Sequence, residues 1–123
     1  MELNEITEKI IGCAIKVHTA LGPGLLESTY EVCLVHELTK LGLSVVRQLA
    51  LPVVYDGVRL DAGYKIDILV EDKVIVELKT VERILPVHEA QLISYLKLSN
   101  KKIGLLINFN VRLLRDGIRR LAN

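Results

Sequence analysis

The sequence predicts an α/β domain in which helices cover both faces of a mixed sheet of four or five strands. Two helical patterns open the chain, short apolar runs rich in valine and isoleucine follow, and a further helical pattern separates the last of these runs from the others. At 123 residues, with half of them apolar and a quarter charged, the chain is long enough for one ordinary core. We therefore expect residues 1–123 to form a single domain.

The first two elements are expected to be helices over residues 4–20 and 25–41. Asn4 is a suitable N-cap for the first helix, and Gly42 is a suitable end for the second. His18, near the end of the first helix, is interpreted as a polar surface residue or a C-terminal helix residue, in preference to a ligand. The stripe that the first helix is expected to bury contains Ile6, Ile10, Cys13, Ala14 and Val17. The second stripe contains Glu27, Tyr30, Glu31, Leu34 and Leu38.

Glu27 is the unusual member of the second stripe, because it is an acid on the side that should face the sheet. An acid in the first turn complements the helix dipole, which explains its place along the helix but not its place on the apolar stripe. Tyr30 lies one turn later and is interpreted either as a core residue or as a hydrogen-bonding partner on the same side.

The middle of the chain predicts strands joined by tight turns. Short strands are expected at 43–49 and 51–55, and Pro52 favours an edge position. Asp56-Gly57 predicts a two-residue hairpin turn. The next strand should run over residues 58–70, with a bend at Ala62-Gly63.

The C-terminal part predicts a helix, a buried strand and a last helix. Pro86 fits the first turn of a helix that ends near Leu98, and Gln91 and Tyr95 share one face of it. A continuous apolar run predicts a buried strand over residues 103–109. A final helix is expected from Asn110 onward. Its inward residues would be Val111, Leu114, Ile118 and Leu121.

Residues 65–81 carry the pattern most suggestive of function. Two apolar arms flank a polar turn, Glu71-Asp72-Lys73, which predicts a hairpin in which residues 74–81 form a central strand. With all three turn residues in the loop, Asp67 lies opposite Glu77, and both share a face with Lys79. A two-residue loop would place Glu77 on the other face, so we predict the three-residue loop.

Two interpretations of these three charged residues remain open. Charges among valines and isoleucines are costly unless they are paired or bind a metal. Lys79 could form a buried structural ion pair with Asp67 or Glu77. Alternatively, the two carboxylates could bind a hard divalent cation, with the lysine orienting or deprotonating a metal-bound water.

The Asp67…Glu77-x-Lys79 pattern on a hairpin resembles the PD-(D/E)XK nuclease superfamily. Gly24-Leu-Leu-Glu27-Ser-Thr-Tyr30 is similar to the signature of the GxxExxY proteins, a family placed in that superfamily. Gln91-Leu-Ile-Ser-Tyr95 is similar to an element of its RecB-like branch, and Leu106-Ile-Asn-Phe-Asn110 to the closing strand of the GxxExxY proteins. The resemblance covers residues 5–120; one departure is Ile66 in place of a proline before Asp67.

The resemblance implies a restriction-endonuclease-like layered fold and a metal-dependent nuclease. The substrate would be nucleic acid, with DNA favoured, and the cofactor Mg²⁺ or Mn²⁺. The implied metal ligands are Asp67, Glu77, Glu27 and the backbone carbonyl of Leu78. The residues implied to be catalytic are Glu27, Asp67, Glu77, Lys79, Gln91 and Tyr95. The alternative is a non-catalytic nucleic-acid-binding or protein-interaction module with the same fold, which would not need this complete set of polar residues.

Composition narrows the remaining possibilities. No apolar run approaches 18 residues and the N-terminus lacks signal-peptide features, so we expect a cytoplasmic protein without a membrane span. No Gly-rich P-loop is present. Cys13 and Cys33 are expected to be reduced core thiols. The net charge is only +1, but residues 97–120 hold seven basic residues against Asp116 alone, a basic end that could contact phosphates or simply be solvated. Whether two copies are needed to cut two strands, as a homodimer would, is left open.

Overall fold

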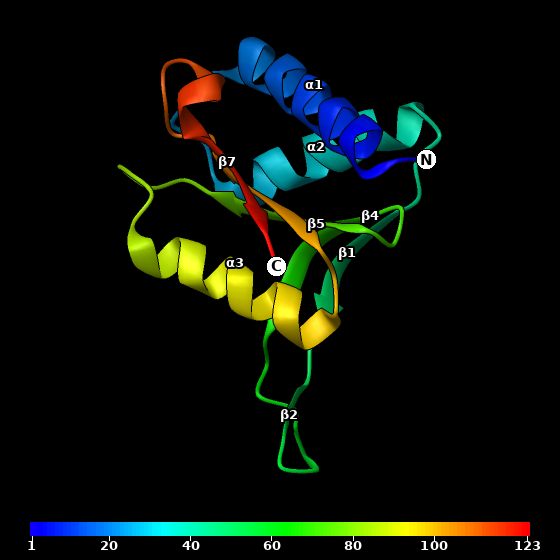
Figure 1. Cartoon of the computed structure of the whole chain (residues 1–123). Helices are drawn as coiled ribbons and strands as arrows, with labels where there is room; N and C mark the ends of the chain where they lie inside the picture. The colour runs from blue at the N-terminus through cyan, green and yellow to red at the C-terminus, as the bar shows by residue number, and fades with distance from the viewer.

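Five strands in the order β1-β4-β5-β6-β7 form one mixed sheet, with α1 and α2 on one face and α3 on the other (Figure 1). The computed structural model describes all 123 residues. The helices are α1 (Leu3–Leu21), α2 (Glu27–Lys40), α3 (Pro86–Ser99) and a short 3-10 helix, η1 (Leu114–Gly117). The strands are β1 (Val45–Ala50), β2 (Val53–Tyr55), β3 (Val58–Leu60), β4 (Lys65–Val70), β5 (Val74–Lys79), β6 (Ile103–Asn108) and β7 (Ile118–Ala122). The α/β class and the mixed sheet of five strands are therefore as the sequence predicts.

The central strand, β5, pairs with β4 on one side and with β6 on the other. The β4–β5 pair is antiparallel and the β5–β6 pair is parallel, with α3 forming the crossover between them. Strand β5 separates two apolar cores. Val74, Val76 and Leu78 pack in the core beneath α1 and α2, whereas Ile75 packs in the core beneath α3. Burial on both faces explains why this strand is almost continuously apolar in sequence.

The hairpin of β4 and β5 has the predicted register. Val70 pairs with Val74, so Glu71, Asp72 and Lys73 form a three-residue loop. The backbone N–H of Lys73 donates to the carbonyl of Val70 at 3.0 Å and closes the turn. This register brings Asp67 opposite Glu77.

The predicted C-terminal helix is wrong. Residues 110–113 form a loop, η1 follows, and β7 then pairs antiparallel with β6. The spacing of the apolar residues suits a helix, but Ile118 contacts the core beneath α1 and α2 whereas Leu121 contacts the core beneath α3. Two residues three apart in sequence point to opposite faces of a strand. The apolar spacing that suggests a helix therefore also fits a strand that contributes one residue to each core. The strand also pairs the edge that β6 would otherwise leave open.

Three smaller predictions also need correction. Asn4 lies inside α1, whose N-cap is Glu2, and the Asn4 side chain accepts a hydrogen bond from Arg120 at 2.8 Å. His18 lies in the last turn of α1, one of its two expected positions, but it is not a surface residue, because it is buried with its Nε2 2.7 Å from the carbonyl oxygen of Val111. The strand predicted over residues 58–70 is two strands, β3 and β4, and the expected bend at Ala62-Gly63 lies in the gap between them.

Strands β2 and β3 form a separate two-stranded arm that projects from the body (Figure 1). Asp56 and Gly57 form its two-residue turn, as predicted, because Tyr55 pairs with Val58. The arm continues from β1 and returns into β4, and it leaves Val54 and Tyr55 exposed. Cys13 and Cys33 are both free thiols, the first buried and the second half-buried.

Gly117 is expected to tolerate no larger residue. A Cβ atom at this position would collide with the carbonyl oxygen of Asn108 and lie 3.1 Å from a methyl carbon of Val111. We expect Gly117→Ala to lower the free energy of unfolding by about 1–3 kcal/mol, the usual cost of overpacking. Urea unfolding measures this change. Gly12→Ala is the matched control: Gly12 lies in α1 with nothing within 4 Å of an added Cβ, so it should stabilise by about 0.5–1 kcal/mol. Equal stabilities for both variants would contradict the expected clash.

Candidate active site

Asp67 and Glu77 lie side by side where the paired part of the β4–β5 hairpin ends. The last paired residues are Ile68 and Val76. Beyond them, the backbone N–H of Asp67 donates to Glu77 Oε1 at 3.3 Å, and the backbone N–H of Leu78 donates to Asp67 Oδ2 at 2.9 Å. Each carboxylate therefore accepts a hydrogen bond from the backbone of the opposite strand, and the two acids are brought into direct contact.

Lys79 connects this acid pair to α3. Glu77 and Lys79 alternate with Val76 and Leu78, which face α1 and α2, so both charged side chains point to the side of α3. The Lys79 Nζ donates to Gln91 Oε1 at 3.4 Å, and the Gln91 amide donates to the Tyr95 hydroxyl at 3.4 Å. As the sequence predicts, Gln91 approaches the hairpin from the third helix.

Glu27 approaches from the other helical layer. It is the first residue of α2 and is half-buried. Burial raises the pKa of its carboxyl group; the negative charge of Asp67 raises it further, and the positive charge of Lys79 opposes the shift. Glu27 thus lies within electrostatic reach of both residues, as expected for an acid on the face of its helix that is predicted to face the sheet.

Glu77 is the most perturbed acid in the protein. Only 4 % of its surface is exposed, and burial raises its pKa to about 9, helped by the charge of Asp67 and a side-chain hydrogen bond to it. Lys79 lowers this pKa, but not enough to offset burial. In the absence of a cation, the raised pKa of Glu77 therefore favours its protonated form at neutral pH.

The chemistry of this pair fits a divalent cation. A cation would replace the proton of Glu77 and compensate both carboxylates. No group of three or more His, Cys, Asp or Glu side chains lies close enough together to bind an ion by itself. A Mg²⁺ site does not need such a group, because Mg²⁺ commonly takes one or two carboxylates and fills its remaining positions with water and other oxygens.

Three polar residues that support the site were not identified from the sequence. Glu31, one turn after Glu27, is 6 % exposed and accepts hydrogen bonds from Arg47 at 2.7 and 3.1 Å and from Gln48 at 2.7 Å. Gln48 has a φ of 49° and is skipped by the β1–β4 ladder, opposite Asp67. The sequence signal was an Arg-Gln pair inside a strand and a second acid on the stripe of α2.

Asp67 is unpaired on both sides of β4. The β1–β4 ladder skips the position where Asp67 faces Gln48, and the β4–β5 ladder ends before the position where Asp67 faces Glu77. Such breaks re-aim side chains and are frequent beside functional sites. Asp67 therefore occupies the irregular position of an otherwise regular sheet.

Tyr30 proves to be a structural residue. It is fully buried and stacks on Phe109 with ring centroids 4.4 Å apart. Its hydroxyl donates to the carbonyl of Gly22 at 2.5 Å and accepts from the N–H of Leu25 at 3.1 Å. Of the two interpretations left open by the sequence, the core role holds, and its hydrogen bonds fix the loop that leads into Glu27.

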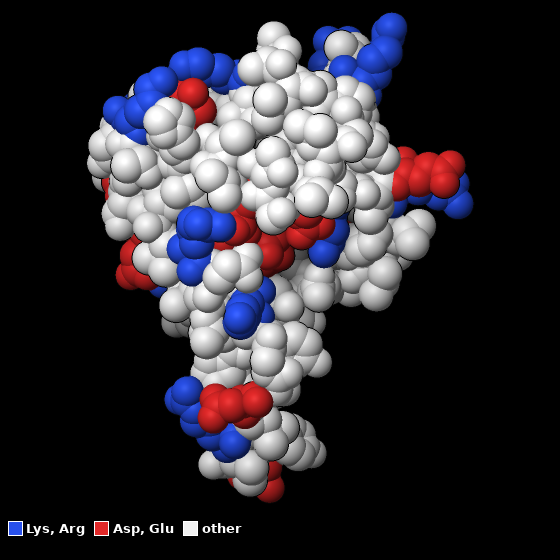
Figure 2. Space-filling model, turned by 180° about the vertical axis from the view of Figure 1, so that it is seen from behind, with Lys and Arg blue, Asp and Glu red and all other residues white.

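The surface around the arm has a distinct charge pattern. Figure 2 shows acidic atoms gathered in a recess between the body and the projecting arm of β2 and β3, with basic atoms on either side. An acidic recess with basic flanks suits a cation in the recess and a polyanion held across it.

The family comparison agrees with this architecture. A family model described as the PD-(D/E)XK nuclease superfamily matches residues 4–121. The chain therefore belongs to the PD-(D/E)XK nuclease superfamily, whose members generally use divalent metals such as Mg²⁺. Searches of curated proteins and of solved structures found no match. None of the helices has the length and apolar character that crossing a membrane requires.

Proposed function

We propose that this chain is a metal-dependent nuclease that hydrolyses phosphodiester bonds in nucleic acid, with DNA as the favoured substrate. The observation that carries the proposal is the contact of Asp67 with the buried Glu77, two residues before Lys79, in which each acid accepts a hydrogen bond from the other's strand. A purely structural pair would be matched in charge, but Lys79 lies in no ion pair with either acid. The pair is short of positive charge, which a cation supplies.

Each site residue has a proposed role. Asp67, Glu77 and the carbonyl of Leu78 would hold Mg²⁺ or Mn²⁺, and Glu27, which forms no three-carboxylate group with them, would contact the ion through a water. When bound, the ion polarises the phosphoryl oxygens and lowers the pKa of its water. Lys79 would orient or deprotonate the attacking water and offset charge on the phosphate. Gln91 and Tyr95 would position Lys79 and contact the substrate backbone.

The proposal also includes the narrower assignment to the GxxExxY proteins and the RecB-like branch. Two features support it: Glu27, the acid of the signature, lies within electrostatic reach of Asp67 and Lys79, and Gln91 hydrogen-bonds both Lys79 and Tyr95. One copy of residues 1–123 contains one such site. Cutting both strands of a duplex in one binding event would call for two copies, and size-exclusion chromatography with and without DNA would detect such a homodimer.

The direct test combines metal binding with cleavage. Mn²⁺ should raise the melting temperature of the wild type, and the loaded protein should cut at least one of four substrates: single- or double-stranded DNA or RNA. Asp67→Asn should abolish both effects, because binding to the folded state alone is what raises the midpoint. Asp61→Asn, at an exposed aspartate paired only with Arg59, is the control and should change neither. Metal binding without any cleavage would instead favour the non-catalytic binding module.

A further inference from the structure

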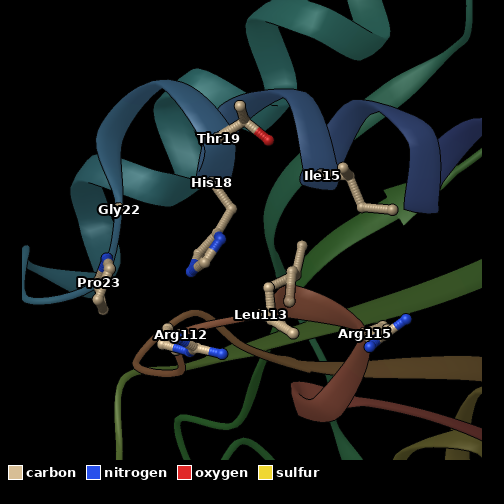
Figure 3. Close-up of a pocket in the computed structure, with 9 residues that line it drawn as sticks. Ile15, His18, Thr19, Gly22, Pro23, Arg112, Leu113 and Arg115 are labelled. Atoms are coloured by element: carbon tan, nitrogen blue, oxygen red, sulfur yellow. The ribbon is translucent and has the colours of Figure 1, made fainter.

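A second cavity lies outside the acid site, between the C-terminal part of α1 and the loop that follows β6 (Figure 3). Its volume is about 580 Å³. Ile15, His18 and Thr19 line it from α1, and Gly22 and Pro23 line it from the following loop. Arg112 and Arg115 line it from the opposite side, where Figure 3 shows both flanking Leu113. We call this cavity the arginine groove.

Both arginines of the groove are electrostatically free. Neither is in an ion pair, and neither side chain donates a hydrogen bond within the protein. None of the residues that line the groove is acidic. Two guanidinium groups, each with five N–H donors and no acceptor, thus border a cavity without a counter-charge. Such groups match the geometry of phosphate oxygens.

The groove is held in shape by buried contacts. His18 Nε2 lies 2.7 Å from the carbonyl oxygen of Val111, and this hydrogen bond holds the loop against α1. Leu114, which lies between Arg112 and Arg115 in sequence, is buried, with 4 % of its surface exposed. The arginines are therefore presented from an anchored loop, which lowers the entropy that a ligand must remove on binding.

The groove is close to the acid site along the backbone on both sides. The N–H of Phe109 donates to the carbonyl of Lys79 at 2.9 Å. Arg112 follows Phe109 by three residues, a span of at most about 11 Å. On the other wall, Gly22 is fixed to Tyr30 in the same helix that begins with Glu27. The groove thus lies beyond the ends of β5 and β6, on the α1 side, so a strand that passes Lys79 on the α3 side and crosses the end of the sheet would reach it within a few nucleotides.

We propose that the arginine groove binds a backbone phosphate of the nucleic acid, a few nucleotides from the bond at Lys79. This inference rests on the proposed function because the ligand is taken to be nucleic acid. It does not require that the protein cleaves that ligand. The groove would fix the direction in which the strand crosses the site, while the acid pair and Lys79 act on the bond itself. Phosphate contacts of this kind position a protein on nucleic acid without reading its sequence.

A structural role for the arginines makes a different prediction. Both could compensate the negative end of the α1 dipole. Their loss would then lower the melting temperature and leave nucleic-acid affinity unchanged, which would overturn the proposal.

The test measures binding of a fluorescent 20-nucleotide DNA, single- and double-stranded, by anisotropy in EDTA at several salt concentrations. Arg112→Gln/Arg115→Gln should lower the affinity at 50 mM salt by at least about tenfold. It should also reduce the slope of log K against log salt by about 1.4 for single strands and 1.8 for duplex, the value for two lost contacts. The matched control is Lys9→Gln/Lys40→Gln, which removes the same charge from exposed residues. Lys40 ends α2, about 20 Å from Glu27 along the helix.

The outcomes distinguish the proposed phosphate binding in the groove from the proposed nuclease activity. Equal affinity and slope for wild type and the groove variant, or no binding by the wild type, would overturn the proposal that the groove binds phosphate. That proposal would equally be overturned if inorganic phosphate at millimolar concentration displaced no DNA from the wild type. Groove-dependent binding by a protein that cuts none of the four substrates would uphold the groove while refuting the proposed function.

Discussion

Replacing Lys79 by methionine is expected to slow nucleic-acid cleavage by at least about 10²-fold while the protein keeps its fold, its melting temperature and its Mn²⁺ binding. The factor is that of a lost general acid–base group. Folding should survive because the Lys79 amino group makes no ion pair, and its one side-chain hydrogen bond, to Gln91, is long at 3.4 Å. The raised pKa of Glu77 keeps it neutral at pH 7 without metal, so the loss of the lysine leaves no buried Glu77 charge without a partner.

Lys73→Met provides the control for this variant. Lys73 is exposed in the turn at the other end of the same hairpin, and its side chain donates only to the carbonyl of Met1, so cleavage should be unchanged. If Lys79 were a structural counter-ion instead, Lys79→Met would cost about 3–5 kcal/mol, the penalty for breaking a buried pair. Wild-type cleavage by the Lys79 variant would exclude Lys79 from the mechanism.

The metal-free protein is expected to lose stability as the pH rises from about 5 to about 9. Glu77 has a folded-state pKa of about 9 against an ordinary value of 4.5. Between these values the folded state holds a proton that the unfolded state has released, so raising the pH favours unfolding. One such group lowers the free energy of unfolding by about 1.4 kcal/mol per pH unit. Urea unfolding in EDTA at pH 5, 7 and 9 measures this slope.

Glu77→Gln should flatten the dependence, because glutamine keeps the neutral shape and cannot ionise. It should therefore be more stable than the wild type at pH 9 and similar at pH 5. Glu82→Gln, at an exposed position, should leave the slope of the wild type unchanged. Saturating Mn²⁺ should restore stability to the wild type at high pH, but not to Glu77→Gln, which lacks the second carboxylate. A wild-type slope no steeper than that of Glu77→Gln would show that Glu77 ionises normally.

The parts of the fold that follow local rules were predictable from the sequence. The register of the β4–β5 hairpin followed from one assumption about its turn, and Asp56-Gly57 identified the turn of the arm. Pro86 correctly marked the start of α3. The end of the chain was mispredicted because Ile118 and Leu121 have the spacing of a helix, and only the open edge of β6 decides in favour of a strand.

The sequence predicted those residues of the candidate site that stand out from their neighbours in the chain. Asp67, Glu77 and Lys79 interrupt apolar runs, and Gln91 and Tyr95 share a helical face, so each could be identified from its neighbours in sequence. The contact of Glu31 with Arg47 and Gln48 could not, because it joins α2 to β1 and involves a residue of positive φ, Gln48, inside a strand. The arginine groove likewise joins residues of α1 to residues almost a hundred positions later.

The position of Glu77 at the centre of the sheet also determines which parts of the site can move. Strand β5 is paired on both sides and buried on both faces, so its amide hydrogens should exchange only when the whole protein unfolds. Glu27 begins a helix without a side-chain cap, and Gln91 lies on the single helix of the other layer. The carboxylate pair is thus held by the part of the fold that we expect to open last, whereas the amides of the first turns of α2 and α3 should exchange earlier, by local opening.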